Sequence, residues 1–336
     1  MRKTYPEIHF FRILACIMVI IIHTTATPVV TLTPNSPPQL LFTLLNRFSK
    51  PSVPMFVFMS GFLLNTLYIG KPLKWLSFWK KRLPKLFMPY FIWASLYFII
   101  YATQGYYPVD LKFYLKGLLQ GSFIYHLYFM VIIIQFYLAY PIFHWLQSKV
   151  GTEKLFLLTL MVQFLFIFIP LPLQDRIMPT YLSYFTLGML LNTNAKPSQK
   201  SPSYYMIAFG IMGSVYTAEF IQSTNNGVYI NARLATVIYI LFSLIACYTL
   251  LMTLKSLGRL YQDIAPEVNF LSQSTLTLYY AHPLVLILLN LVLDKLGIAS
   301  ISLRALIAFL GIFIILIPIL LIIEYFKPKL AFVNKP

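Results

Sequence analysis

The stretch EIHFFRILACIMVIIIH, residues 7–23, decides how this chain folds, because it is strongly apolar and yet contains ionisable side chains. The apolar run continues to about Val30. A membrane-spanning helix needs roughly 17–25 mostly apolar residues, which this run provides. It is too long for a signal peptide and lacks a small-residue cleavage site, so we expect it to stay in the membrane as a helix.

Two side chains in this first helix stand out. Arg12 and His23 are eleven positions apart, which places them on one helical face and roughly 16 Å apart along the axis. Taken alone, Arg12 is compatible with a snorkelling anchor and His23 with a hydrogen-bonded packing histidine. Because ionisable groups are costly in a bilayer, two of them on one stripe favour a functional role.

The composition of the chain requires a membrane as its solvent. Of 336 residues, 59% are hydrophobic and 10% are charged, whereas soluble domains carry about 25% charged residues. The mean hydropathy is +0.75. We therefore predict an all-α polytopic membrane protein with about ten transmembrane helices, forming a single domain over residues 1–336.

Ten apolar stretches are candidates for these helices, the sixth being short. We expect the segment 111–119 to be a short amphipathic helix, and 29–50 and 104–122 to be outer connecting segments. The ten predicted stretches are 8–30, 51–69, 86–103, 123–146, 155–171, 179–191, 204–221, 232–254, 270–293 and 303–326.

The basic residues alternate between the connecting segments. One set of segments carries 17 lysines and arginines and the opposite set carries seven. Since positive charge accumulates on the cytoplasmic side, this asymmetry predicts that both termini are cytoplasmic. It also explains the net charge of +17 without nucleic acid, which we exclude as a partner.

The two cysteines give no sign of metal or redox chemistry. Cys16 and Cys247 lie in separate apolar stretches without CxxC spacing, and no cluster of histidine and cysteine has the spacing of a metal site. We predict that they are small core residues and that the protein needs no metal.

A serine–glycine pair and a basic segment are the next polar features. Ser60-Gly61 favours close helix packing over catalysis, and the chain has no GxSxG motif. The segment KKRLPKLFMPY, residues 80–90, places Lys81, Arg82 and Lys85 at the predicted cytoplasmic mouth, just before a helix. Cations at a helix N-terminus bind anions, although a topology signal alone explains part of this cluster.

Two further histidines lie in aromatic surroundings. In FIYHLYFM, residues 123–130, His126 and Tyr128 lie at the outer end of a predicted helix, where aromatic belts are common and sugars can stack. In SQSTLTLYYAHPLVL, residues 272–286, His282 follows Tyr279 at mid-membrane depth, matching His23. Pro283 would leave a backbone carbonyl for a side chain to satisfy, so a structural role is as plausible as a direct one.

These features together resemble the acyltransferase-3 family of membrane O-acyltransferases. The resemblance covers most of the chain, in the family's order. Its finer pattern, including IIIQFYLAYPIF at residues 132–143, is similar to the branch with the intercellular-adhesion membrane protein of biofilm polysaccharide loci. The matching residues are Arg12 with His23, Ser60-Gly61-Phe62, Arg82 to Lys85 before Pro89, His126 to Phe129, and Ser274 through Tyr280 to His282.

Two positions depart from the family pattern. Lys85 stands where a second arginine is usual, which keeps the charge but loses the bidentate fork for phosphate. An acidic residue commonly precedes the first-helix arginine, but here Glu7 lies five residues before Arg12.

The resemblance implies transfer of an acyl group, acetyl most often and succinyl as an option, from cytoplasmic acyl-coenzyme A to a hydroxyl of a cell-surface or lipid-linked saccharide. It implies location in a bacterial plasma membrane. His23 would be the general base or a transient acyl carrier, with Arg12 beside it in the catalytic set. The donor would contact Lys81, Arg82 and Lys85, and the acceptor would contact Ser60, His126, Tyr128, Tyr279 and His282.

A polysaccharide or metabolite exporter is the competing interpretation, because ten helices with buried polar residues suit a transporter as well. Transporters more often show internal repeats and broken helices near the midplane, of which Pro283 and Pro318 are weak signs.

Overall fold

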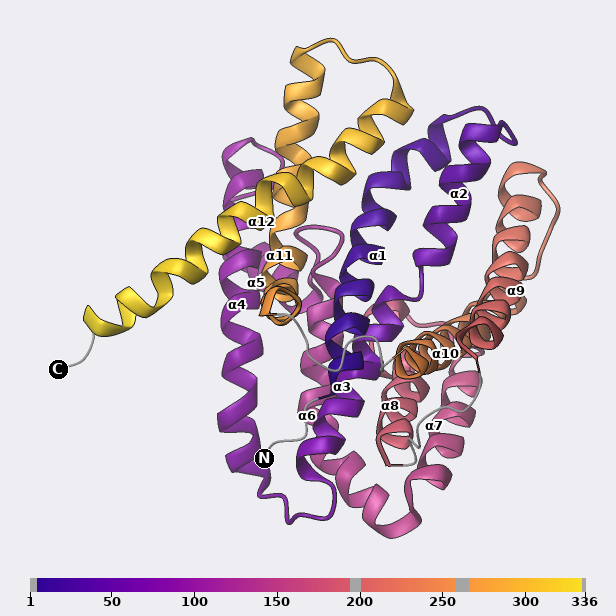
Figure 1. Cartoon of the computed structure of the whole chain (residues 1–336), viewed down its shortest axis with the longest axis vertical. Helices are drawn as coiled ribbons and strands as arrows, with labels where there is room; N and C mark the ends of the chain where they lie inside the picture. The colour runs from indigo at the N-terminus through magenta and orange to yellow at the C-terminus, as the bar shows by residue number, and fades with distance from the viewer. Residues whose placement is uncertain (1–4, 194–200, 258–265, 334–336) are drawn as a thin grey trace. The chain divides into compact units, whose positions relative to one another are not determined.

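The computed structural model describes residues 5–193, 201–257 and 266–333, and every regular element in these ranges is helical (Figure 1). The short turns η1 (Gln174–Arg176), η2 (Met178–Tyr181) and η3 (Ile221–Asn225) join longer helices. The α-helices are α1 (Pro6–Thr31), α2 (Pro37–Ser49), α3 (Ser52–Tyr68), α4 (Trp75–Thr103), α5 (Leu111–Gln120), α6 (Tyr128–Val150), α7 (Thr152–Phe166), α8 (Leu182–Thr193), α9 (Pro202–Phe220), α10 (Ala232–Ser256), α11 (Pro266–Lys295) and α12 (Ile301–Val333).

Each of the ten predicted stretches contains a helix. Six helices of the described chain are long and apolar enough to cross a bilayer, namely α1, α4, α6, α10, α11 and α12. The other four, α3, α7, α8 and α9, are shorter or less apolar. The structure therefore confirms an all-α multi-pass membrane protein, whereas the count of ten spans and the cytoplasmic termini stay predictions. Some of the basic residues counted for topology lie outside the described residues: Arg2, Lys3, Lys196, Lys200, Arg259 and Lys335.

The prediction for residues 29–50 was wrong in one respect, because much of this segment forms the helix α2. Prolines at its first two positions begin the helix. Its buried residues are polar: the Gln39 amide donates to the Val29 carbonyl at 3.2 Å, and the Asn46 amide to the Ile22 carbonyl at 3.0 Å. A helix that is held to its neighbour by amides has little hydropathy signal in its sequence.

Two predictions around α4 and α5 had different outcomes. Helix α4 begins at Trp75 and not near residue 86, so the predicted helix start was wrong and Lys81, Arg82 and Lys85 lie inside the helix; their role in binding the donor stays a prediction. The predicted amphipathic helix is confirmed as α5. An Asp110 side chain caps it by accepting from the Phe113 N–H at 2.7 Å.

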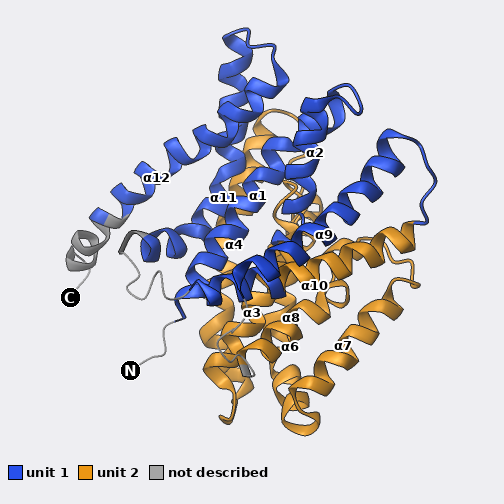
Figure 2. Ribbon diagram, turned by 45° about the vertical axis from the view of Figure 1, so that its right-hand side comes forward, with its two compact units in different colours: residues 1–52, 198–231, 248–336 blue, residues 53–197, 232–247 orange. Residues whose placement is uncertain are grey.

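The chain forms two compact units (Figure 2). Unit 1 comprises residues 1–52, 198–231 and 248–336, with α1, α2, α9, α11, α12 and the end of α10. Unit 2 comprises residues 53–197 and 232–247, with α4 to α8, nearly all of α3 and the first part of α10.

Helices α1 and α11 of unit 1 run in the same direction with a constant register. The Arg12 guanidinium donates to the Ser272 carbonyl at 3.4 Å, and the Cys16 thiol points at the Thr275 carbonyl at 3.7 Å. Further along, the rings of His23 and His282 stack. Each pair is separated by 259 or 260 positions in the sequence, so the two helices keep in step from Arg12 to His23.

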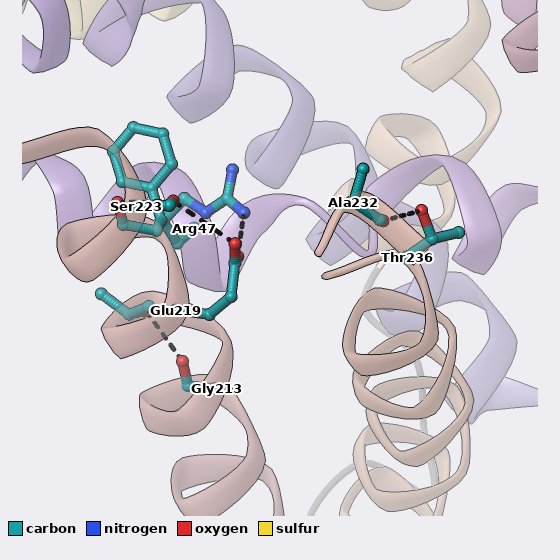
Figure 3. A network of polar contacts seen from close by, with 8 residues as sticks. Arg47, Gly213, Glu219, Ser223, Ala232 and Thr236 are labelled. Carbon is teal, nitrogen blue, oxygen red and sulfur yellow. Dashed lines mark hydrogen bonds and ion pairs between the residues drawn. The ribbon is translucent and has the colours of Figure 1, made fainter. Parts of the chain in front are cut away.

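Elsewhere in unit 1, an ion pair joins α2 to α9 (Figure 3). The Arg47 guanidinium lies 3.7 Å from the Glu219 carboxylate. It also lies 3.9 Å above the centre of the Tyr216 ring. Ser223 donates to the same carboxylate at 3.4 Å. Both charged side chains are mostly buried, which favours a fixed contact between these helices.

In unit 2, α3 and α8 approach so closely that glycine is required at the contact. A Cβ added at Gly61 would come within 2.0 Å of the Phe185 carbonyl oxygen, and one at Gly188 within 2.0 Å of the Phe58 carbonyl oxygen. The Asn65 amide donates across the same contact to the Met189 carbonyl at 2.8 Å. This supports the packing interpretation of Ser60-Gly61.

Candidate active site

Unit 1 contains a polar-lined cavity of about 420 Å³ between α1, α11 and α12. His23 lies on its wall together with polar and small side chains, a composition that suits a hydrophilic ligand. Its volume falls within the usual range of small-molecule sites. The lining residues are His23, Thr24, Thr27, Pro28, Leu286, Asn290, Ala299, Ile301, Arg304, Ala305 and Ala308.

His23 is paired with His282 behind the cavity wall. Their ring centroids are 5.4 Å apart with an interplanar angle of 25°. His282 is fully buried, at 0% exposure, and is not part of the lining, whereas His23 is half-buried and reaches the cavity. The Tyr279 ring lies 6.1 Å from His282 and is also buried. The matching depth predicted from the sequence thus corresponds to direct contact.

The ring of His282 is oriented by the backbone of its own helix. Its Nδ1 lies 3.2 Å from the Leu278 carbonyl oxygen, where an Nδ1–H donates, and the Tyr279 carbonyl is also a hydrogen-bond partner of this ring. Pro283 has no backbone N–H, so it cannot form the usual helical hydrogen bond to the Tyr279 carbonyl. The sequence predicted such a carbonyl in need of a side-chain partner. With Nδ1 as donor, Nε2 of His282 is the acceptor nitrogen.

Lys50 is a functional candidate outside the predicted catalytic and binding residues. It lies at the break between α2 and α3, half-buried, and its charge acts on the His23 imidazole. In the sequence it looked like an ordinary basic residue of an outer segment. Only the helix break, which was not predicted, brings it toward the histidine pair.

Arg12 lies further along the same face of α1, about three helical turns from His23, the nearest cavity residue of this helix. Its contact with the Ser272 carbonyl ties it to α11 at that level. Arg12 therefore belongs to the same α1–α11 seam as His23, although it is not part of the cavity lining.

The far end of the cavity lining holds a second group that the sequence analysis missed. Arg304 contacts Asp294 at 2.6 Å, the Ile298 carbonyl at 3.2 Å and the Asn290 side chain at 3.5 Å. Asn290 and Arg304 both line the cavity. The available signal was the four-residue spacing of Leu286, Asn290 and Asp294, which puts these three residues on neighbouring positions of one face of α11.

The predicted donor residues lie on α4 in unit 2. The Nε of Arg82 donates to the Tyr68 hydroxyl at 3.1 Å, and its guanidinium carbon lies 5.6 Å from the centre of that ring. Lys81 and Lys85 are exposed, whereas Arg82, three positions before Lys85, is half-buried. The structure therefore engages Arg82 with α3 and leaves the two lysines exposed.

The remaining predicted residues of unit 2 lie in packed surroundings. His126 is 2% exposed, in the turn before α6, with the ring of Tyr97 at 5.7 Å. Tyr128 begins α6 and faces the Arg176 guanidinium at 6.0 Å. The Ser60 hydroxyl donates to the Phe56 carbonyl of its own helix at 3.0 Å. None of them lines the cavity of unit 1, and their roles stay predictions.

The described residues contain no group of three or more histidine, cysteine, aspartate or glutamate side chains placed to hold a metal ion. Both cysteines are buried, as expected for core residues.

Residues 5–323 match the family described as an acyltransferase domain, the acyltransferase-3 family. The match spans nearly the whole chain and both compact units, so the chain belongs to this family and is a membrane acyltransferase. No curated protein and no solved structure matched the chain. The finer likeness to the intercellular-adhesion branch stays a prediction.

Proposed function

We propose that this protein transfers an acyl group, acetyl in the first instance, from cytoplasmic acyl-coenzyme A to a hydroxyl of a cell-surface or lipid-linked saccharide in a bacterial plasma membrane. The observation that carries the proposal is the polar cavity with His23 on its wall and His282 stacked behind it. A half-buried imidazole facing a polar cavity is suited to act on an acceptor hydroxyl. Membership of the acyltransferase-3 family supplies the reaction class.

His23 acts as general base in this proposal. It takes the proton of the acceptor hydroxyl while the oxygen attacks the thioester carbonyl, and the tetrahedral intermediate then expels the coenzyme A thiolate, which is protonated by the imidazolium. The ester bond forms as the thioester bond breaks, so atoms and charge balance. An acyl-imidazole intermediate on His23 is the alternative, with the same two bond changes divided between two steps.

The neighbours of His23 have supporting roles. His282 holds the ring in one orientation by stacking, and Lys50 supplies positive charge near the place where an oxyanion would develop. Arg12 orients the donor along the α1–α11 seam, and Lys81, Arg82 and Lys85 bind its phosphates.

The test uses purified full-length protein in proteoliposomes with acetyl-coenzyme A labelled in the acetyl group and a panel of oligosaccharides. We expect ester-linked label on saccharide, released by mild base. His23→Ala should lower the rate by roughly 10²–10⁴-fold, as for loss of a general base. His144→Ala is the control, because this histidine contacts the Lys71 carbonyl and lies outside the cavity.

Two results would contradict the proposal. Near-normal transfer by His23→Ala would exclude His23 as the base. Saccharide movement across the vesicle membrane without any requirement for coenzyme A, and with no labelled product, would favour the exporter instead.

A further inference from the structure

One charged residue on the wall of the unit 1 cavity, Arg304, already forms an ion pair within the protein. Arg304 at the start of α12 pairs with Asp294 at the end of α11, with 2.6 Å between the guanidinium and carboxylate atoms. The guanidinium also donates to the Ile298 carbonyl at 3.2 Å and to the Asn290 carbonyl at 3.4 Å. The side chain is 25% exposed and lines the cavity.

The position of this group relative to His23 fits one bound ligand. His282, which stacks on His23, and Asn290 are eight residues apart on one face of α11, about 12 Å along the axis. Thr24 and Thr27 of α1 line the cavity between the two ends, and Ala305 and Ala308 of α12 leave room opposite them. A saccharide held at Asn290 and Arg304 can therefore present a hydroxyl toward His23.

The charges of Arg304 and Asp294 decide which class of saccharide the cavity suits. The Asp294 carboxylate compensates the Arg304 charge, so the pair is neutral as a unit; Arg304 lines the cavity, whereas Asp294 lies outside the lining and acts through Arg304. A neutral polyol can use N–H donors that carry no net charge, whereas an anionic sugar at Arg304 would be repelled by the Asp294 carboxylate beside the guanidinium. The amide of Asn290 and the threonine hydroxyls add further neutral partners.

We propose that Arg304, Asp294 and Asn290 form a specificity-determining subsite that selects a neutral saccharide as acceptor and disfavours a uronic acid. This inference rests on the proposed acyl transfer and deepens it by assigning the class of acceptor. The ion pair is the selecting element, because it removes the net charge that would otherwise attract a carboxylate.

The test compares two acceptors that differ only at C6, butyl glucoside and butyl glucuronide, in the labelled-acetyl assay. The wild type should acylate the glucoside with the higher kcat/KM. Asp294→Asn leaves the guanidinium uncompensated, so the ratio of glucuronide to glucoside kcat/KM should rise by roughly tenfold or more. Arg304→Met should raise KM for the glucoside with little change in kcat.

The protein offers a matched control for the charge change. Asp175 pairs with Arg176 at 3.5 Å, and the side-chain exposures of that pair, 61% and 25%, nearly equal the 60% and 25% of Asp294 and Arg304. Asp175→Asn should leave the acceptor ratio unchanged. The same shift in Asp175→Asn, or no shift in Asp294→Asn with the fold retained, would overturn the subsite.

A binding measurement separates this inference from the proposed function. Saturation-transfer NMR with the two butyl glycosides needs no acyl transfer, and the glucoside signal should weaken in Arg304→Met. If wild type labels no saccharide, the acyl-transfer proposal fails. If transfer occurs but neither the kinetic ratio nor the NMR signal responds to Asp294→Asn or Arg304→Met, only the subsite fails.

Discussion

At the scale of single residues, the histidine pair shows how a costly group is kept in a membrane helix. His282 is fully buried and has two carbonyls of its own helix as hydrogen-bond partners, one of them released by Pro283. Because the ring is fixed in this way, it can fix the ring of His23 in turn. This contact supports the positioning role that we propose for His282, in place of the acceptor contact that the family resemblance implied.

This role predicts a graded response to substitution. His282→Ala should lower kcat by roughly a hundredfold with little change in KM for the acceptor, because misplacing His23 slows the reaction without removing a binding group. His282→Asn keeps an N–H donor for the Leu278 carbonyl and should recover part of the loss. The check is steady-state kinetics of both variants, with thermal unfolding in detergent to confirm the fold. Equal losses in both variants would argue against positioning.

At the scale of helices, the contact between α3 and α8 depends on two glycines. Gly61→Ala would bring a methyl group within 2.0 Å of the Phe185 carbonyl oxygen, which cannot move aside as a flexible side chain can. We expect a loss of about 1–3 kcal/mol or more in stability, seen as a lower Tm in detergent. Gly210→Ala is the control, since its Cβ would meet no atom within 4 Å, and it should be neutral or slightly stabilising. A Tm for Gly61→Ala equal to that of Gly210→Ala would contradict this packing.

The helices also show what the sequence can and cannot predict. The long apolar helices were predicted because the bilayer demands a continuous hydropathy signal, and α5 because its faces differ in polarity. Helix α2 was missed because its buried face holds amides such as Gln39 and Asn46. The beginning of α4 was placed too late because a basic segment with proline resembles a connecting loop.

At the scale of the whole molecule, the candidate site depends on the register of helices far apart in the sequence. Arg12, His23 and His282 stand out in the sequence because they are ionisable residues in apolar runs. Asn290 and Arg304 do not, since each lies near the end of a helix where polar residues are ordinary. They become part of a site only when α12 folds back beside α1 and α11.

The shared direction of α1 and α11 leads to a prediction about topology. Helices that run in step from Arg12–Ser272 to His23–His282 must end on the same side of the membrane. Asn35→Cys after α1 and Ser300→Cys after α11 should therefore both react with an impermeant maleimide added outside intact cells. Lys71→Cys should react only after permeabilisation, since positive-inside charge places its segment in the cytoplasm. Cys16 and Cys247 are buried, so background labelling should be low.

Two results would contradict different parts of this prediction. Labelling of positions 35 and 300 from opposite sides of the membrane would contradict the parallel pairing of α1 and α11. Labelling of position 71 from outside would contradict only the charge-based orientation.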